Sequence, residues 1–328
     1  MKNNISIVGG YGFVGTRLSE VLSSGEIDHG IFDNKADINS EDYLDVEHLE
    51  SLDALKNSSV IINLAAIHRD DIKPVTRYDD VNIGGAINIC KCAEKFNINT
   101  IIFTSSVAIY GFAPKNTGED GAPNYFNDYG RTKYEAELIY KKWQKDDPEN
   151  RSLIIIRPTV IFGEGNRGNV YNLLNQINSK RFLMIGSGNN FKSMAYVENV
   201  ASFIKYSLSF SKGVHIYNYI DKPDFNMNTL IKTIRKTLFN KDDIGIRIPL
   251  FIGMTIGYIA DLVTIIFKKK LPVSSIRVKK FVSDSMFATS IDRTDFIPPV
   301  SLEKGLQNTL KYEFLEDNKG KKEFLTEW

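Results

Sequence analysis

Short apolar segments alternate with amphipathic ones through the first half of the chain. Apolar runs typical of buried strands occur at residues 5–8, 27–32, 60–64, 100–103 and 153–156. The segments between them place apolar residues at helical spacing, at residues 15–22, 46–55, 82–96 and 129–145. Strands that alternate with helices in this order favour parallel strands joined by crossover helices. The pattern predicts an α/β fold built on a doubly wound parallel sheet.

The pattern changes after Gly163, where loops rich in Gly and Asn separate shorter elements. A chain of 328 residues can hold a doubly wound domain of about 150 residues and a second unit of similar size. We therefore predict one domain at residues 1–165 and a smaller C-terminal α/β portion at residues 166–328, which mainly binds substrate.

One apolar stretch, residues 248–267, is long enough to cross a bilayer and is followed by three lysines at 268–270. Asp261 lies inside it and would cost roughly 3 kcal/mol at the centre of a bilayer. A proline and two glycines within the stretch suit a packed helix. We therefore predict that it packs within the C-terminal portion and does not span a membrane. Peripheral membrane contact is the alternative.

The charge balance and the two cysteines limit which partners and which cellular compartment the sequence indicates. Lys and Arg number 41 and Asp and Glu number 40, so nothing global indicates nucleic acid as a partner. Cys90 and Cys92 lie two residues apart in a predicted helix and would point to different faces, which argues against a disulfide or a metal pair. The chain enters its first strand without the sequence of a secretory signal. We expect a cytoplasmic protein without a metal site.

Glycines follow the first predicted strand at a spacing that suits a dinucleotide. Gly9, Gly12 and Gly15 would let the chain turn tightly and bring the first amides of the next helix against a pyrophosphate. A glycine pattern alone is weak, because hairpins and helix caps also use it. Asp33 ends the second predicted strand, where an acid accepts the adenosine ribose hydroxyl and repels the 2′-phosphate of NADP. The combination favours NAD, although Lys35 weakens this preference.

The strongest candidate chemistry joins the end of the fourth strand to the following helix. Tyr129 and Lys133 are four residues apart, so a helix places both on one face, where the ammonium lowers the pKa of the phenol from about 10. A phenolate can take the proton of a secondary alcohol as hydride leaves for a nicotinamide, and Ser106 can hydrogen-bond the same oxygen. Alone, such a Tyr and Lys are more simply a surface pair. Their order after the glycine turn and the acid favours catalysis.

These segments together resemble the extended short-chain dehydrogenase/reductases, the NAD-dependent epimerase/dehydratase family that acts on nucleotide sugars. The resemblance covers nearly all of the chain. The matching segments are Gly9 to Gly15, Asp33-Asn34, Asp45-Val46, Leu64 to Ala66, Val81-Asn82 with Gly85, Ser105-Ser106, Tyr110-Gly111, Tyr129 to Lys133 and Arg157 to Gly163. The resemblance implies a Rossmann fold, NAD as the cofactor, a nucleotide sugar as the substrate and a homodimer.

The resemblance also implies roles for single residues. The catalytic residues are Ser106, Tyr129 and Lys133. The cofactor-binding residues are Gly9, Gly12, Phe13, Val14, Gly15, Asp33, Asn34, Asp45, Val46, Leu64, Ala65, Ala66, Asn82, Ser105, Tyr129, Lys133 and Pro158. The substrate-binding residues are Ser106, Asn169, Lys192 and Arg277.

Each substrate assignment outside the catalytic set has an alternative. Lys192 replaces the arginine with which the family meets the diphosphate, and a lysine cannot form the bidentate fork. Asn169 could cap the helix that follows it. Arg277 could be a solvated surface charge.

The residues between Ser106 and Tyr110 limit which reactions of the family this chain can catalyse. Val107 and Ala108 stand where dehydratases of the family carry an Asp-Glu pair, and neither can exchange a proton. We therefore predict a 4-epimerase, which oxidises the hexose C4 hydroxyl and returns the hydride to the other face. Two alternatives stay open: an NAD(P)H-dependent reductase of a nucleotide-4-keto sugar, and a catalytically silent NAD-binding sensor or scaffold.

Overall fold

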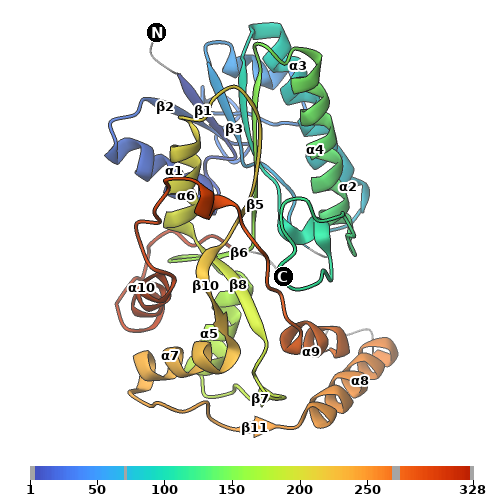
Figure 1. Cartoon of the computed structure of the whole chain (residues 1–328), viewed down its shortest axis with the longest axis vertical. Coiled ribbons are helices and arrows are strands. Elements are labelled where there is room, and N and C mark those ends of the chain that lie inside the picture. Colours follow the sequence, from blue (N-terminus) through green and yellow to red (C-terminus); the bar gives the residue numbers. More distant parts are fainter. Residues whose placement is uncertain (1–3, 70–71, 268–273, 326–328) are drawn as a thin grey trace.

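The computed structural model describes residues 4–69, 72–267 and 274–325. Its centre is a six-stranded sheet in which all neighbouring strands run parallel. In spatial order the strands are β2 (His29–Phe32), β1 (Ile5–Val8), β3 (Val60–Asn63), β4 (Thr100–Thr104), β5 (Ser152–Pro158) and β9 (Gly213–Tyr219). The predicted doubly wound parallel sheet is confirmed (Figure 1).

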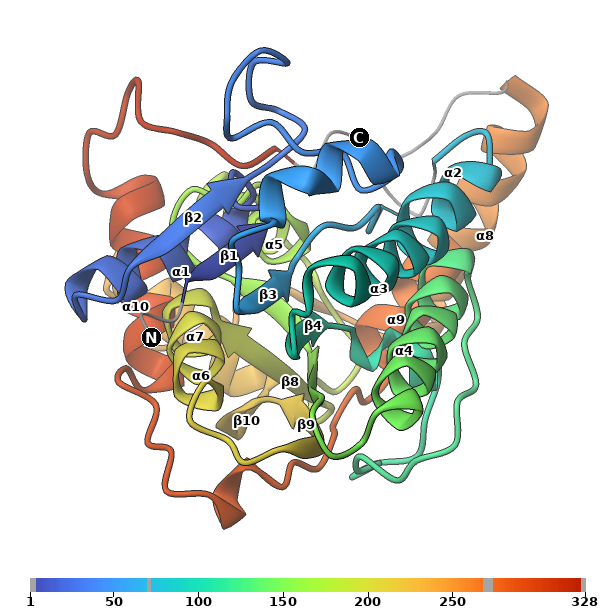
Figure 2. The same ribbon diagram turned by 90° about the horizontal axis from the view of Figure 1, so that it is seen from above.

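Helices cover both faces of this sheet (Figures 1 and 2). On one face, α1 (Phe13–Ser24) and α6 (Val197–Ser207) share an apolar core with the strands. On the other face, α3 (Gly85–Phe96) and α4 (Asp128–Asp146) share a second core with the 3-10 helix at Leu49–Leu55. Because the central strands β1, β3, β4 and β5 are buried on both faces, their sequences are mostly apolar.

Two predicted helices differ in form from the expectation. The segment predicted as a helix at residues 46–55 is a 3-10 helix at Leu49–Leu55. The helix predicted from residue 82 follows the short helix α2 (Thr76–Tyr78) and starts as π-helical turns at Asp79–Gly84. Gly85 then brings α3 close to the neighbouring loop, since a Cβ there would lie 2.9 Å from Cγ2 of Val46. Periodicity predicted the helices but not these local variants.

The chain beyond residue 165 returns to the sheet and, together with residues 160–162, also builds a second core. It supplies β9 and α6 to the doubly wound part. The remaining strands form two small sheets, β10 (Asp221–Asn226), β8 (Phe191–Tyr196) and β6 (Val160–Phe162) in one, and β11 (Arg247–Ile248) and β7 (Met184–Ile185) in the other. Helices α5 (Asn169–Asn178), α7 (Met227–Phe239) and α10 (Leu302–Phe314) pack with them. The functional division at residue 165 stays a prediction.

Helix α8 (Leu250–Phe267) lies at the outer edge of the C-terminal part beside α9 (Ser275–Val282) (Figure 1). Its buried residues are Gly253, Gly257 and Ala260, and 17% of the helix is buried. The prediction that this stretch packs within the C-terminal portion is therefore wrong for its large side chains, and the prediction that it does not span a membrane stays a prediction.

The physical reason is that α8 packs through its smallest residues. A Cβ at Gly257 would lie 2.8 Å from Cα of Ser275, and a Cβ at Gly253 would lie 2.5 Å from Cγ2 of Ile185. Because the two glycines make these close contacts, the large side chains of α8 point outward. By length and composition α8 is able to cross a membrane. The lysines at 268–270 lie outside the described residues.

Candidate active site

The sheet brings two predicted cofactor segments to one point of its edge. β1 pairs with β2 on one side and with β3 on the other, so the strand order reverses between β1 and β3. Ligands of open α/β sheets bind outside the carboxyl ends of the strands at such a reversal. The turn at residues 9–15 follows β1, and Leu64 to Ala66 follow β3. These segments meet where a dinucleotide is expected.

The glycine turn is packed too closely for larger residues. Gly9 has a φ of +81°, and a Cβ there would lie 2.7 Å from the backbone nitrogen of Ala65. A Cβ at Gly15 would lie 2.5 Å from the carbonyl oxygen of Gly9. Helix α1 begins at Phe13, directly after Gly12, and the first amides of a helix have no intrahelical acceptor. The turn and these amides fit a pyrophosphate.

Asp33 follows β2, and the backbone orients its buried carboxylate. One oxygen accepts the N–H of Tyr11 at 2.9 Å, and the other accepts the N–H of Lys35 at 3.0 Å. Each carboxylate oxygen has a second lone pair for a ribose hydroxyl. A negative charge fixed in this way also disfavours a 2′-phosphate. Asn34, the next residue, is exposed.

Ser105 and Ser106 follow β4 at the same edge of the sheet. The buried Ser105 hydroxyl has no hydrogen-bond partner among the described residues, although its backbone N–H donates to the carbonyl of Ile156 at 2.7 Å. A buried hydroxyl without a partner is costly, so a bound cofactor that pairs with it fits this position. Ser106 starts the 3-10 helix at Val107–Tyr110, and its Oγ accepts the N–H of Ala108 at 3.1 Å.

Tyr129 and Lys133 lie one turn apart at the start of α4, as predicted. The helix start is packed directly on the segment after Ser106, because a Cβ at Gly130 would lie 2.5 Å from the carbonyl oxygen of Ala108. The sequence Tyr-Gly therefore places the tyrosine where α4 and the 3-10 helix meet. The three predicted catalytic residues come together in one neighbourhood.

Lys133 is buried beneath this meeting point. It is 2% exposed, and its ammonium lies 4.3 Å from the centroid of the Phe103 ring. Burial lowers the pKa of Lys133 to about 7, while the charge of Glu137 opposes the shift. A positive charge in a dry site acts strongly on a nearby phenol. The role of Lys133 in stabilising the Tyr129 phenolate stays a prediction.

Two predicted cofactor residues are held by their own neighbours. The Asn82 amide donates to the carbonyl of Ile67 at 3.0 Å and to the hydroxyl of Thr132 at 2.9 Å, and its oxygen accepts the N–H of Ile67 at 2.9 Å. Asn82 thereby ties the segment after β3 to α4. Asp45 accepts the N–H of Glu47 at 3.0 Å. Direct contact of Asn82 and Asp45 with the cofactor stays a prediction.

Sequence reasoning missed a buried ion pair that anchors α4. Arg157 of β5 donates to both carboxylate oxygens of Glu137, at 2.8 and 2.6 Å, and to the Tyr110 hydroxyl at 2.6 Å. The Tyr110 hydroxyl in turn donates to Asn218 of β9 at 2.9 Å. A signal was present, because Arg157 stands in an apolar strand and a buried charge requires a partner. Glu137, four residues after Lys133 on the same helix, was the nearest candidate.

The structure gives Lys192 a supporting contact. This half-buried residue of β8 donates to the carbonyls of Lys280 and Ser283 at 2.8 and 2.7 Å, and burial lowers its pKa to about 8. It thereby holds the C-terminal end of α9. A substrate phosphate would compete with two carbonyls for this ammonium, and its role in binding the diphosphate stays a prediction.

The other predicted residues lie at the ends of elements. Asn169 is the exposed first residue of α5, and Gly168 occupies the N-cap position that the alternative gave to Asn169. Arg277 is exposed on α9, and Pro158 ends β5. Their contacts with substrate or cofactor stay predictions.

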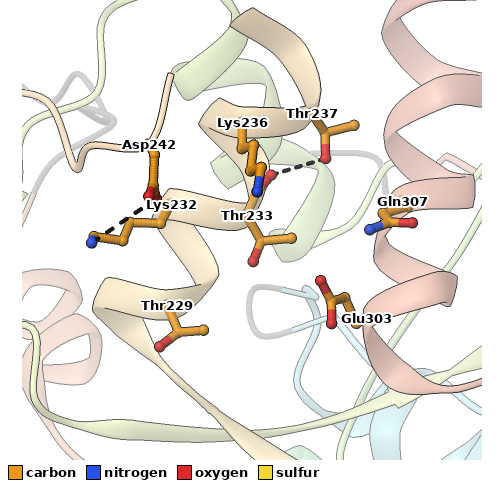
Figure 3. Close-up of a pocket in the computed structure, with 8 residues that line it drawn as sticks. All are labelled: Thr229, Lys232, Thr233, Lys236, Thr237, Asp242, Glu303 and Gln307. Atoms are coloured by element: carbon orange, nitrogen blue, oxygen red, sulfur yellow. Dashed lines mark hydrogen bonds and ion pairs between the residues drawn. The ribbon is translucent and has the colours of Figure 1, made fainter. Parts of the chain in front are cut away.

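A pocket of about 430 Å³ opens on α7 and α10, and Figure 3 shows its lining. The lining residues are Thr229, Lys232, Thr233, Lys236, Thr237, Asp242, Glu303 and Gln307. None of them belongs to the predicted catalytic or cofactor set. The Lys232 ammonium lies 4.0 Å from the Asp242 carboxylate across this polar surface. The pocket is separate from the candidate active site.

The strand-order reversal, with its glycine turn, acid and Ser-Tyr-Lys set, defines an NAD-binding Rossmann enzyme of the short-chain dehydrogenase/reductase type. The NAD dependent epimerase/dehydratase family matches residues 5–219 of this chain. The chain therefore belongs to that family, and the predicted NAD cofactor is confirmed. NAD, when bound, accepts and returns a hydride.

Two curated relatives agree with the family. The chain is 43% identical over 332 residues, with both chains fully covered, to the N-acetyl-alpha-D-glucosaminyl-diphospho-ditrans,octacis-undecaprenol 4-epimerase of Escherichia coli. It is 30% identical to the UDP-glucose 4-epimerase of Vibrio cholerae, over 62% of this chain and 66% of the relative.

Solved structures agree with the fold. The UDP-N-acetylglucosamine 4-epimerase of Methanobrevibacter ruminantium superposes with a TM-score of 0.72 at 20% identity, over 95% of this chain and 98% of the other. The UDP-glucose 4-epimerase of Thermus thermophilus with NAD gives 0.70 at 16% identity, over 94% and 98%.

Proposed function

We propose that the protein is an NAD-dependent 4-epimerase of a hexose that is joined to a diphosphate. The observation that carries this proposal is the convergence of Ser106, Tyr129 and Lys133 beside Val107 and Ala108, which cannot exchange a proton. Such a set supports oxidation and reduction at one carbon without loss of water. The full-length relative at 43% identity is named as a 4-epimerase, which supports the same reaction.

Each catalytic residue has one task in this reaction. Tyr129, as a phenolate, takes the proton of the C4 hydroxyl, and Ser106 hydrogen-bonds the same oxygen. Lys133 favours the phenolate through its charge. The ketone has to turn its other face before the hydride returns, so the site must hold the diphosphate more firmly than the sugar ring. Tyr129 then gives the proton back to the C4 oxygen.

The group on the other side of the diphosphate from the sugar, which we call the carrier, has two candidates. A nucleotide, as predicted from the sequence, is supported by the UDP-sugar 4-epimerases among the relatives and the structural neighbours. A polyprenol lipid is the second candidate. It is favoured by the name of the relative at 43% identity and by the exposed apolar helix α8.

A direct conversion assay tests the function and the carrier. The purified protein is incubated with NAD and either UDP-N-acetylglucosamine or N-acetylglucosaminyl-diphospho-undecaprenol in detergent, and the products are resolved by their C4 configuration. We expect a C4 epimer without added NADH, and none with Tyr129→Phe. NADH-dependent reduction of a 4-keto sugar would instead identify the reductase, and NAD binding without conversion of either substrate would identify the sensor.

We also infer a homodimer from the family resemblance, and a cytoplasmic site of action from the two cysteines and the start of the sequence. Light scattering of the purified protein tests the first, and a mass of one chain would contradict it. Protease protection tests the second. Protease added to intact cells should leave a cytoplasmic protein uncut, and the protein should be digested only after the cells are broken.

A further inference from the structure

Helix α8 exposes a continuous apolar face. Its exposed large apolar residues are Leu250, Phe251, Ile252, Ile256, Tyr258, Ile259, Leu262, Ile265, Ile266 and Phe267, and Thr255 among them is exposed as well. Phe251 and Ile265 are 70% and 73% exposed. At about 3.6 residues per turn, the nine of these positions from Phe251 to Phe267 cover about 200° of the helix surface. An apolar patch of this extent marks a docking surface.

The opposite side of α8 fixes its orientation on the protein. Gly253 and Gly257 pack against β7 and the start of α9, and Ala260 is buried on the same side. The Asp261 carboxylate accepts the N–H of Ser275 at 3.2 Å, at the first turn of α9. The one acidic residue of the helix is therefore turned away from the apolar face.

Basic and aromatic residues border the apolar face. Helices α8 and α9 together carry three basic residues, Arg277, Lys279 and Lys280, and one acidic residue, Asp261. On the α9 side, the Lys279 ammonium lies 5.9 Å from the Phe112 ring and the Lys280 ammonium lies 4.5 Å from the Phe126 ring. Both rings are 48% exposed. Aromatic rings and cations beside an apolar face are typical of the boundary between a bilayer and water.

We propose that α8 docks on an anionic phospholipid bilayer, with its axis in the membrane plane and its apolar face among the acyl chains. A spanning orientation would carry α9, with Arg277 and Lys279, into the hydrocarbon, because α9 packs along α8. A second copy of the chain fits less well. A two-fold dimer through this face would bring the basic residues of both copies together.

The docking surface is connected directly to the predicted substrate segment. The N–H of Gly186 donates to the carbonyl of Ile248 at 3.0 Å, two residues before α8. Lys192 holds the end of α9, and Phe126 lies three residues before Tyr129. A docked protein therefore presents its active site close to the bilayer. If the proposed function holds, this placement lets the enzyme reach a sugar diphosphate that stays anchored in the membrane.

Vesicle flotation of the full-length protein, without substrate, tests the docking. The vesicles are phosphatidylcholine alone or phosphatidylcholine with phosphatidylglycerol. We expect the protein to float with the anionic vesicles and less with the neutral ones. The variant Ile259→Gln/Leu262→Gln/Ile266→Gln should lower the bound fraction at least about tenfold.

The control variant Ile87→Gln/Leu138→Gln/Leu315→Gln removes exposed apolar residues elsewhere and should bind as the wild type does. NAD binding shows that each variant is folded. Absence of wild-type flotation with anionic vesicles would overturn the proposal, as would a dimer that the α8 variant dissociates. Extraction from cell membranes by detergent but not by alkaline carbonate would overturn the in-plane arrangement.

Flotation also separates this proposal from the proposed function. A protein that binds anionic vesicles but converts neither substrate supports the docking and contradicts the epimerase. A protein that converts substrate but does not bind vesicles supports the epimerase and contradicts the docking.

Discussion

Helices α4 and α8 span 19 and 18 residues, and they differ in what they bury. α4 is the more polar of the two, yet it buries Thr132, Lys133, Glu137 and Gln144 against the sheet. α8 is almost wholly apolar and exposes its large side chains. The comparison shows that the segments packed against each helix, rather than the polarity of the helix, decide which of its side chains are buried. The Glu137 charge is buried in α4 because it meets Arg157, and apolar residues stay exposed on α8 because only its small residues meet the protein.

The largest expected effect is on the buried pair of α4. Arg157 is buried, with only 4% of its surface exposed. Glu137→Gln removes its counter-charge, and breaking such a buried pair lowers the free energy of unfolding by about 3–5 kcal/mol. Denaturant unfolding measures this loss. Glu135→Gln is the matched control, because the Arg131–Glu135 pair is more exposed and should contribute less than about 1 kcal/mol. Equal losses for the two variants would contradict the distinction between them.

The next effect concerns catalysis at the start of α4. Tyr129→Phe should keep the fold and NAD binding and lower turnover by about 100-fold or more, the usual contribution of a positioned acid/base. Tyr134→Phe, on the same helix, should keep turnover near the wild-type value. The conversion assay under saturating NAD measures both. Near wild-type turnover for Tyr129→Phe would remove this residue from the mechanism.

A pH-dependent effect tests the burial of Lys133. Burial holds its folded pKa at about 7, below the usual 10.5, so the unfolded chain binds more protons between these values. Burial of the charged lysine therefore lowers the unfolding free energy of the NAD-free protein by its full amount below pH 7. This loss becomes smaller as the pH rises towards 10.5. Lys133→Met should raise the melting temperature most near pH 6–7, and Lys145→Met should give no such trend. A gain that grows with pH would contradict the assignment.

The smallest effect is expected at the polar position of α8. Asp261→Asn keeps an oxygen for the N–H of Ser275 but removes a charge from the first turn of α9, a change of about 0.3–1 kcal/mol. Thermal unfolding at low salt measures it. A loss as large as that of Glu137→Gln would show that α8 is held as tightly as α4, and would weaken the contrast between them.

The regular part of the fold follows from the sequence. The strands β1 to β5 and the helices α1 and α4 were predicted within a few residues, because apolar runs and helical spacing depend on local sequence. The return of β9 to the edge of the sheet was not predicted. Its pairing with β5 joins residues about sixty positions apart, and no local pattern encodes such a partner.

The candidate site was predictable to the extent that its residues belong to short motifs. The glycine turn, Asp33 and the Tyr129–Lys133 spacing are such motifs. The Glu137–Arg157 pair was not predicted, because it depends on how α4 lies on β5. The exposure of α8 was not predicted either, because apolar composition favours burial and the glycines that turn the helix outward act through contacts with distant segments.

The most direct test of the central claim follows the hydrogen at C4. The substrate that is converted is prepared with deuterium at C4 and incubated with the protein and catalytic NAD in ordinary water, and the product is analysed by mass spectrometry and NMR. A 4-epimerase passes this atom to NAD and returns it to the same carbon, so we predict a C4 epimer that keeps its deuterium. Loss of the label to solvent, or a product that forms only with added NADH, would contradict the account.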